Sequence, residues 1–354
     1  MRGTPRSGLS GLGLAALLAL LFGCSQPAQG PALLDDYLQR LSRTLDAEAP
    51  DATSLWAPPR LRDAGIAPLE IPRAKLDMLD FLALSGCELQ VNLGRRNSSL
   101  GRNAAASQVL LLDLEFLALA PACVNALRLA GNEQLALHIQ AAQAMKIRFL
   151  PHRIFNALLA GPEYEQFWKL PGALAAYPET AGGAVIDSLH WFDRAIHMWL
   201  SGDYRFQVDQ LEDQLFHLRN GDGGALLLAA TLQARTFERG NALLAHRLER
   251  GPLCPGTSVT ATATTLKTVV SKFFAGGVQP WLAQLDLRDR ELLPPIRGVE
   301  AQLAPVLPDA FQRWSKQREA TLTTLRSMPR THIAALQALA ASCPGGLLGG
   351  APQT

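Results

Sequence analysis

Residues 34–45 read LDDYLQRLSRTL, and this stretch decides the fold class because its apolar side chains recur with a helical period. Positions i, i+3, i+7 and i+11 of the stretch hold Leu34, Tyr37, Leu41 and Leu45. This spacing places the four side chains on one face of an α-helix. The same pattern returns at Val208, Leu211, Leu215 and Leu218. We therefore expect an all-α protein whose helices each bury one apolar face.

Further helical runs extend over most of the chain. They lie near residues 107–130, 133–148, 182–201, 223–249, 279–293, 309–327 and 330–342. Asn132 is the expected N-cap of the run that starts at 133, and Asp203 is the expected N-cap of the run around Leu211. Prolines are expected to break the helices between these runs. The prolines concerned are Pro151, Pro171, Pro178, Pro252, Pro255 and Pro329.

Strand signals are few. Residues 88–93 alternate polar and apolar side chains, but the segment is short. Residues 257–265 are rich in Thr and read either as a strand or as the capped start of a helix that runs through Phe274. The helix is favoured because apolar side chains from Leu266 to Phe273 would then share a face. The sequence predicts one large irregular helical bundle over residues 32–343, followed by a flexible tail, 344–354.

The first 23 residues have the organisation of an export signal. Arg2 and Arg6 supply a positive start, and residues 9–22 are almost entirely apolar. That apolar run is shorter than the roughly 20 residues that a membrane-spanning helix needs. Residues 21–24, Leu-Phe-Gly-Cys, resemble the lipobox of bacterial lipoproteins, which implies cleavage before Cys24 and lipidation of its thiol. The alternative is an ordinary secretory signal with a chance cysteine.

The segment after the lipobox predicts where the folded part lies. Residues 24–31 are expected to be the lipidated cysteine and a tether. Residues 25–31 have no apolar period and reach at most roughly 25 Å. Ser25 resembles the signal that sends such lipoproteins to the outer membrane. We therefore expect a protein that is lipid-anchored through Cys24 on the periplasmic face of the outer membrane.

The charge balance of the chain excludes a broad nucleic-acid footprint. There are 33 Lys and Arg against 31 Asp and Glu, and removal of Arg2 and Arg6 leaves 31 against 31. Hydrophobic residues make up 48% of the chain and charged residues 18%, which is ample for a buried core. No nucleic-acid partner is expected.

Four cysteines remain after Cys24, an even number in an oxidising compartment. They are Cys87, Cys123, Cys254 and Cys343. Of the three pairings, we favour Cys87 with Cys123, which flank one helical stretch, and Cys254 with Cys343, which would tie the C-terminal end to a Pro-Gly loop. Four buried free thiols are the alternative. The spacing of Cys and His does not suit zinc, so no metal or cofactor is expected.

Three segments carry a family resemblance. In the first, Cys87-Glu88-Leu89 is followed by Arg96-Asn97-Ser98-Ser99-Leu100-Gly101-Arg102 and by a helix that ends at Pro121-Ala122-Cys123. The other two are Leu150-Pro151 with Ile154-Phe155-Asn156-Ala157, and Val278-Gln279-Pro280-Trp281-Leu282-Ala283. These segments resemble an uncharacterised family of Gram-negative lipoproteins defined by a domain of unknown function. The resemblance covers most of the mature chain, supports lipidation and the Cys87–Cys123 pairing, and implies no activity.

Residues 94–102 are the main predicted binding segment. Arginine side chains, loop amides and a following helix N-terminus together suit an anion such as a phosphate or a carboxylate. The predicted anion-binding residues are Arg95, Arg96, Asn97, Ser98, Ser99 and Arg102. The alternative is a structural segment whose Asn and Ser side chains bond their own backbone and whose arginines pair with carboxylates.

Two further groups have weaker chemical signals. His190, Asp193 and His197 share one helical face and could form half of a metal site, although histidines that cap a partly buried helix are the more common outcome. Glu163, Glu165 and Glu179 surround aromatic residues, as carboxylates do in sugar-cleaving clefts, but acidic helix starts are ordinary.

Motifs of known catalytic machinery do not occur in the sequence. There is no Gly-x-Ser-x-Gly elbow and no Walker loop. The sequence therefore favours a non-enzymatic envelope protein that binds a protein or glycan partner. A binder of a small anionic ligand or lipid headgroup through residues 95–102 is the second hypothesis, and an envelope hydrolase is the third.

Overall fold

The computed structural model describes residues 30–51, 57–72, 81–82 and 84–344. Regular structure within these ranges is helical and includes no β-strand, so the predicted all-α fold is confirmed. The predicted signal peptide, Cys24, most of the tether and all but the first residue of the predicted tail lie outside the described residues.

The helices follow one another with short connections except after Leu45, after Ala64, after Phe167 and before Ala261. In chain order they are α2 (Gly30–Leu45), η1 (Leu61–Ala64), α4 (Leu89–Asn97), α5 (Ser99–Arg102), α6 (Ala106–Leu129), α7 (Glu133–Ala157), α8 (Pro162–Phe167), α9 (Ala184–Leu200), α10 (Val208–Arg219), α11 (Gly223–Glu249), α12 (Ala261–Val269), the π-helical η2 (Val270–Val278), α13 (Gln279–Gln302), η3 (Ala304–Val306) and α14 (Asp309–Ala340).

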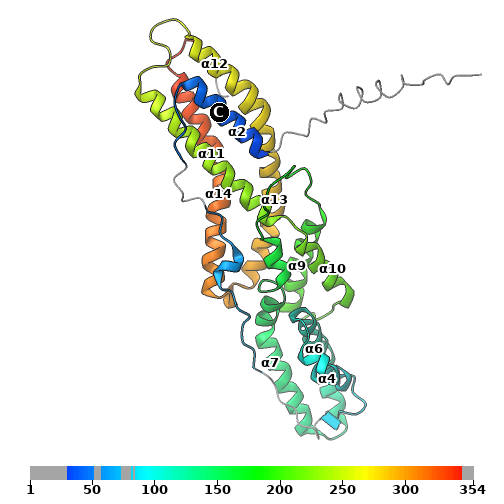
Figure 1. Ribbon diagram of the computed structural model, residues 1–354. Helices are drawn as coiled ribbons and strands as arrows, with labels where there is room; N and C mark the ends of the chain where they lie inside the picture. Colours follow the sequence, from blue (N-terminus) through cyan, green and yellow to red (C-terminus); the bar gives the residue numbers. More distant parts are fainter. Residues whose placement is uncertain (1–29, 52–56, 73–80, 83, 345–354) are drawn as a thin grey trace, which may run out of the picture.

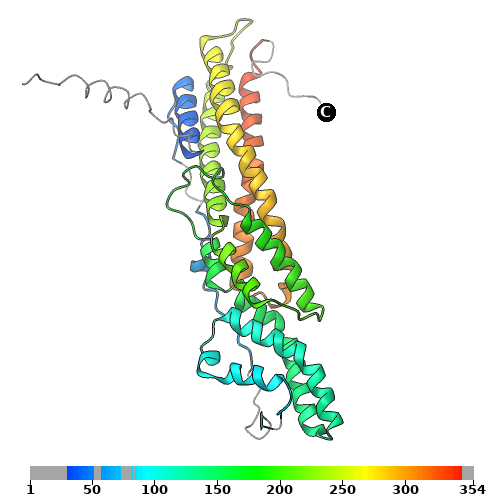
Figure 2. The ribbon, with the colours of Figure 1, turned by 90° about the vertical axis from the view of Figure 1, so that its right-hand side faces the viewer.

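These helices build an elongated body (Figure 1). At one end α12 packs on α2, α2 packs on the long helix α11, and α11 packs on α14. At the other end α4 lies against the hairpin of α6 and α7. Helices α8, α9 and α10 occupy the middle. Figure 2 shows α11, α13 and α14 running side by side along the upper part of the body.

The body has a large core and a smaller one. The large core contains Leu34, Tyr37, Leu41 and Leu45, the side chains whose spacing predicted a helix over residues 34–45. Each of them is at most 2% exposed. The smaller core lies between α4, α6 and α7. Helices α6 and α7 contribute side chains to both cores, so the smaller one is an extension of the same body.

The two favoured disulfides are present. Cys87 pairs with Cys123 across the smaller core, with their Cα atoms 5.7 Å apart. Cys254 pairs with Cys343 at 4.9 Å between Cα atoms and fastens the end of the described chain to the loop that precedes α12.

Two of the predicted helix starts are confirmed by the structure and one is wrong. The Asn132 side chain accepts a hydrogen bond from the Leu135 N–H at 3.3 Å, which confirms it as the cap of α7. Thr260 caps α12 in the same way through Ala263, so the Thr-rich segment does start a helix. Asp203 is not a cap, because α10 begins only at Val208 and the Asp203 carboxylate accepts hydrogen bonds from Arg205 instead.

Two of the expected helix breakers lie inside helices. Pro151 is within α7 and Pro329 is within α14. A proline inside a helix leaves the carbonyl four residues earlier without its usual donor. At Pro329 that carbonyl belongs to Leu325, and it accepts a hydrogen bond from the Gln233 side chain of α11 at 3.1 Å. The partner helix therefore supplies the missing donor, which the local sequence could not indicate.

Helix α2 begins at Gly30, two residues before the predicted start of the domain. A Cβ atom at Gly30 would lie only 2.1 Å from the Trp281 ring of α13. The last two residues of the predicted tether therefore belong to the folded body, and the path from Cys24 to the body is six residues long.

A polar cluster lies inside the large core around His332. Its Nδ1 is 2.7 Å from the Asn241 amide oxygen, and its Nε2 is 2.6 Å from the Tyr37 hydroxyl. Because an amide oxygen only accepts, Nδ1 carries the proton and Nε2 accepts from the Tyr37 hydroxyl. Burial lowers the pKa of His332 to about 3, so the ring is neutral.

Helix α6 is long and apolar enough to span a bilayer, and no other described helix is. One such helix is weak evidence of a membrane protein. More than half of its most apolar window is buried inside the body, and its buried Asp113 pairs with Lys146 and Arg153 of α7. These contacts are those of a core helix.

Candidate functional site: a basic pocket

The predicted anion-binding segment forms two short helices, α4 and α5, joined at Ser98. The Ser98 hydroxyl accepts a hydrogen bond from the Gly101 N–H at 3.0 Å and donates one to the Arg95 carbonyl at 2.8 Å. Ser98 is therefore an N-cap, and its polar atoms are used within the segment.

The arginines of this segment also have partners within the chain. Arg95 forms an ion pair with Glu115 of α6, and Arg96 donates to the Gly101 carbonyl at 2.7 Å. Asn97, Ser99 and Arg102 are exposed. These contacts are what the structural alternative requires, and anion binding by residues 95–102 stays a prediction.

The structure does not bring the other predicted groups together. His190 and His197 are exposed, while Asp193 accepts a hydrogen bond from Gln302 at 2.6 Å. Glu165 and Glu179 line two different cavities. Within the described ranges, no three His, Cys, Asp or Glu side chains are grouped as metal ligands would be.

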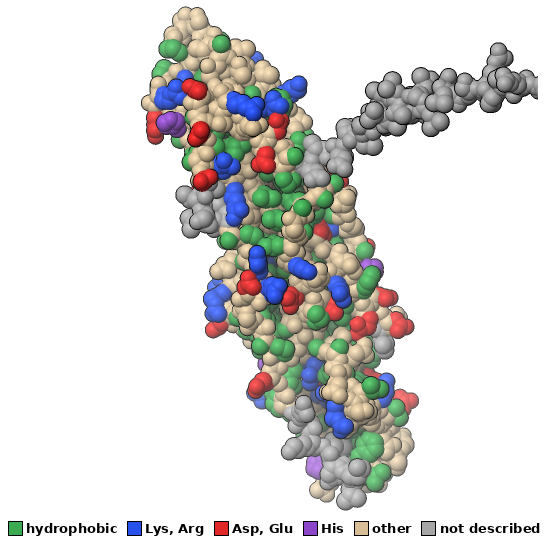
Figure 3. Space-filling model, in the orientation of Figure 1, with side chains coloured by type: hydrophobic (Ala, Val, Ile, Leu, Met, Phe, Trp, Pro, Cys, Tyr) green, Lys and Arg blue, Asp and Glu red, His purple; other side chains and the backbone are tan. Residues whose placement is uncertain are grey.

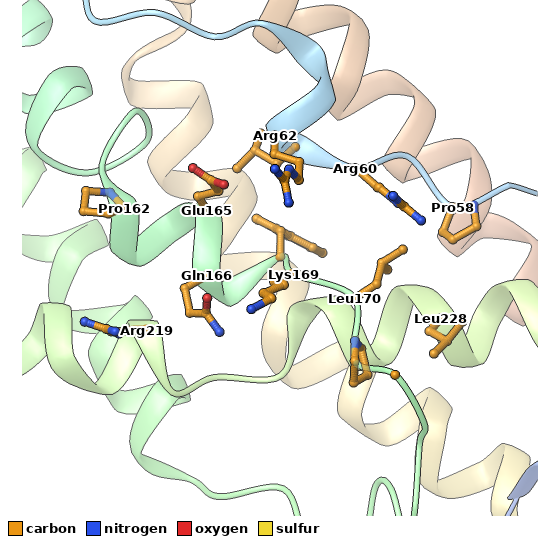
Figure 4. A pocket seen from close by; sticks show the side chains of 14 residues that line it. Pro58, Arg60, Arg62, Pro162, Glu165, Gln166, Lys169, Leu170, Arg219 and Leu228 are labelled. Carbon is orange, nitrogen blue, oxygen red and sulfur yellow. The ribbon is translucent and has the colours of Figure 1, made fainter.

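A cavity of about 780 Å³ opens on the side of the body, and we call it the basic pocket (Figure 4). Its lining residues come from the segment around η1, from α8 and the loop after it, and from α10 and α11. They are Pro58, Arg60, Leu61, Arg62, Pro162, Glu165, Gln166, Trp168, Lys169, Leu170, Pro171, Gly172, Arg219 and Leu228. Figure 3 shows several Lys and Arg side chains near the middle of one face, with Asp, Glu and hydrophobic side chains among them.

Trp168 forms the floor of the basic pocket and is almost completely buried. Its ring meets Trp314 of α14 edge to face, with the centroids 5.4 Å apart, and meets Phe167 at 4.9 Å. The Trp314 indole N–H donates to the Pro59 carbonyl at 3.4 Å, which fastens the segment that carries Arg60 and Arg62. One aromatic cluster therefore positions two walls of the pocket.

Close backbone packing fixes the loop that carries Lys169. A Cβ atom at Gly224, in the first turn of α11, would lie 2.0 Å from the Lys169 carbonyl oxygen. A Cβ at Gly223 would lie 2.6 Å from the Phe167 ring. Only glycines allow α11 to begin so near the loop, because they have no side chain.

A buried ion pair lies beneath the floor. Arg318 is fully buried, and its guanidinium donates to both carboxylate oxygens of Glu300, at 2.6 and 2.9 Å. The same guanidinium lies 5.0 Å from the Trp168 and Trp314 rings. Burial alone would lower the pKa of Arg318, but the hydrogen bonds to Glu300 raise it above its ordinary value, so the residue stays charged.

The Tyr164 hydroxyl completes this arrangement by donating to Glu300 at 2.9 Å. Burial, reinforced by the Glu300 charge, raises the pKa of Tyr164 well above its ordinary value. The phenol therefore stays protonated and remains a hydrogen-bond donor. Beneath the floor, the positive charge of Arg318 is paired with carboxylates, whereas the charges at the mouth of the pocket do not balance.

The mouth of the basic pocket has an excess of positive charge. Arg60, Arg62, Lys169 and Arg219 face a single carboxylate, Glu165, so the lining carries four positive charges against one negative, or +3. The whole chain has 33 Lys and Arg against 31 Asp and Glu, so this excess is local.

Most of these cations have no carboxylate partner. In the described part of the chain, no carboxylate lies within 4.0 Å of Arg60, Lys169 or Arg219, and Arg62 approaches only its neighbour Asp63, at 4.0 Å. Opposite charge from a ligand would lower the mutual repulsion of these groups. The arrangement is chemically suited to bind an anion, and it offers no nucleophile paired with a base.

Sequence reasoning found one residue of this pocket, Glu165, and assigned it to a different chemistry. The four positive residues stand at three distant places in the chain, Arg60 with Arg62, then Lys169, then Arg219, and no local pattern joins the three places. Arg60-Leu61-Arg62 was the available signal, because two arginines flank an apolar residue that the structure buries.

Fold and pocket together define an all-α, disulfide-stapled helical body with an open basic pocket on its side. The chain belongs to the family described as "Protein of unknown function (DUF3080)", whose model matches residues 34–344. This membership confirms the resemblance to an uncharacterised family, while lipidation stays a prediction. No curated protein matches the chain, and no solved structure does either.

Proposed function

We propose that this chain is a lipoprotein of the bacterial outer membrane, anchored through Cys24 on the periplasmic face, whose helical body binds an anionic ligand of the envelope in the basic pocket. The observation that carries the binding proposal is the set of three cations, Arg60, Lys169 and Arg219, that share one cavity without carboxylate partners. The lipobox supports the anchor.

The ligand site in this proposal differs from the segment that the sequence favoured. Arg95 and Arg96 have partners within the chain, whereas the basic pocket has both volume and unpaired charge. Pockets of about 300–1,000 Å³ typically hold small ligands. A small anionic ligand of the envelope therefore suits the site better than a broad protein interface.

Titration calorimetry with inorganic pyrophosphate tests the binding proposal. We expect a Kd tighter than about 1 mM at low salt, and weaker binding as salt screens the exposed cations. The double variant Lys169→Gln/Arg219→Gln should lose most of the binding, and Lys267→Gln, an exposed lysine on α12, is the matched control. Wild-type affinity in the double variant, with loss in Arg102→Gln, would move the site to residues 95–102 and refute the pocket.

Metabolic palmitate labelling tests the anchor. We expect label in the wild-type chain and none in Cys24→Ala, together with release of that variant from the outer-membrane fraction. An unlabelled wild-type chain would refute the proposed anchor and would leave the pocket proposal standing.

A further inference from the structure

The basic pocket has two chemically different ends. Figure 4 shows Glu165, Gln166 and Arg219 toward one end of the cavity, beside Pro162, with Arg62 and Lys169 nearer its middle. Together these polar residues, which we call the polar end, present three positive charges, one amide and one carboxylate. We call the opposite side, described next, the apolar end.

The apolar end is formed by Pro58, Leu170 and Leu228, with Arg60 at its rim (Figure 4). Leu170 and Leu228 are half-buried, so part of each side chain faces the cavity. A ligand that covers this exposed apolar surface binds more tightly, by a factor of about four for each methylene removed from water.

The size of the pocket exceeds that of a simple anion. The volume of about 780 Å³ lies within the range of about 300–1,000 Å³ that is typical of pockets for whole small molecules. Inorganic phosphate at the polar end would leave the apolar end filled only by water. A ligand that contacts both ends must join a negative group to an apolar one.

Glu165 adds a requirement at the polar end. A carboxylate beside three cations repels an anion but accepts hydrogen bonds from a hydroxyl group. A phosphate monoester satisfies both kinds of neighbour, because its charged oxygens face Lys169 and Arg219 while its P–OH group donates to Glu165.

We propose that the basic pocket binds an anionic amphiphile, with a phosphate headgroup at the end formed by Arg62, Lys169 and Arg219 and an apolar chain over Leu170 and Leu228. This inference rests on the proposed function and names its ligand class. A monomeric phospholipid or a related phosphorylated lipid of the envelope has this chemistry.

Three soluble probes distinguish the parts of the proposal. They are sn-glycerol 3-phosphate, dihexanoyl phosphatidic acid and dihexanoyl phosphatidylcholine, the lipids used as monomers. Calorimetry uses the exported chain with Cys24→Ser, which keeps every residue of the described body and needs no detergent. The first two probes share a phosphate monoester, and phosphatidic acid carries two acyl chains in place of the two hydroxyls of glycerol phosphate. Phosphatidylcholine carries the same chains on a headgroup without net charge.

We expect phosphatidic acid to bind at least about tenfold more tightly than glycerol phosphate, because each buried methylene contributes a factor of about four. Lys169→Gln should weaken both phosphate probes at least about threefold. Leu228→Ser should weaken only phosphatidic acid. Leu248→Ser, which removes an exposed leucine elsewhere on the same helix, should change neither.

Any other outcome contradicts a specific part of the proposal. Equal affinity for glycerol phosphate and phosphatidic acid would overturn the amphiphile assignment and leave the proposed anion site in place. Equal affinity for phosphatidylcholine and phosphatidic acid would overturn the anionic headgroup. Binding of none of the three probes, together with no binding of pyrophosphate, would overturn the proposed function itself.

Discussion

Replacement of Arg318 by Met should strongly destabilise the protein. The wild-type guanidinium is the counter-charge of Glu300, whose side chain is only 11% exposed. Met keeps much of the apolar volume of Arg but removes the charge and both hydrogen bonds. Removal of one partner from a buried ion pair costs about 3–5 kcal/mol, because the other charge is left in a poor solvent.

The contacts also predict which partner is more sensitive. In Glu300→Gln, Arg318 still donates to Glu319 at 2.9 Å, so its charge stays compensated. In Arg318→Met, Glu300 keeps only the neutral Tyr164 hydroxyl. We therefore expect Arg318→Met to cost more than Glu300→Gln, and the double variant to cost less than the sum of the two.

Urea unfolding measures these free energies. With a slope of about 3 kcal/mol per molar urea, the midpoint of Arg318→Met should fall by about 1 M or more. Arg128→Met is the matched control, because its pair with Glu133 is exposed and should be worth about 0–1 kcal/mol. A loss below about 1 kcal/mol in Arg318→Met, or strict additivity in the double variant, would refute the compensation argument.

Three further predictions concern the disulfide, the buried histidine and the glycine contact. Joint replacement of Cys254 and Cys343 by Ala should lower the unfolding free energy by about 4–5 kcal/mol, since their bond closes a long loop, 89 residues in sequence separation. The free energy of unfolding should fall by about 1.4 kcal/mol per pH unit below about pH 6.5, because His332 takes up a proton at a higher pH in the unfolded chain than in the folded chain. In acid titrations of stability, His332→Gln should lack this slope. Gly224→Ala should cost about 1–3 kcal/mol in urea unfolding and weaken anion binding, as its Cβ would displace the Lys169 backbone, whereas Gly183→Ala should be nearly neutral.

Specific results would contradict each of these. Unchanged stability of the cysteine variant under oxidising conditions would contradict the loop-entropy estimate. Identical pH slopes in wild type and His332→Gln would show that other groups account for acid sensitivity. Wild-type stability and binding in Gly224→Ala would show that the loop after α8 moves freely away from α11.

Much of the fold followed from local signals. The period of residues 34–45, the cap at Asn132 and the Thr-rich start of α12 each depend on atoms a few residues apart, and each was read correctly. Errors arose where distant groups replaced local ones. Pro329 does not end its helix because a side chain from α11 bonds the Leu325 carbonyl, and Asp203 does not cap a helix because Arg205 takes its carboxylate.

The sequence by itself determined that this chain is helical and which faces of its helices are apolar, because helical periodicity acts over a few residues. Only the tertiary structure decided where unpaired charge collects. Arg60, Lys169 and Arg219 are separated by 50 residues or more along the chain, and they share a cavity because Trp168 and Trp314 pack beneath it and glycines let α11 approach. Contacts of that kind depend on how whole helices pack, which no local pattern encodes.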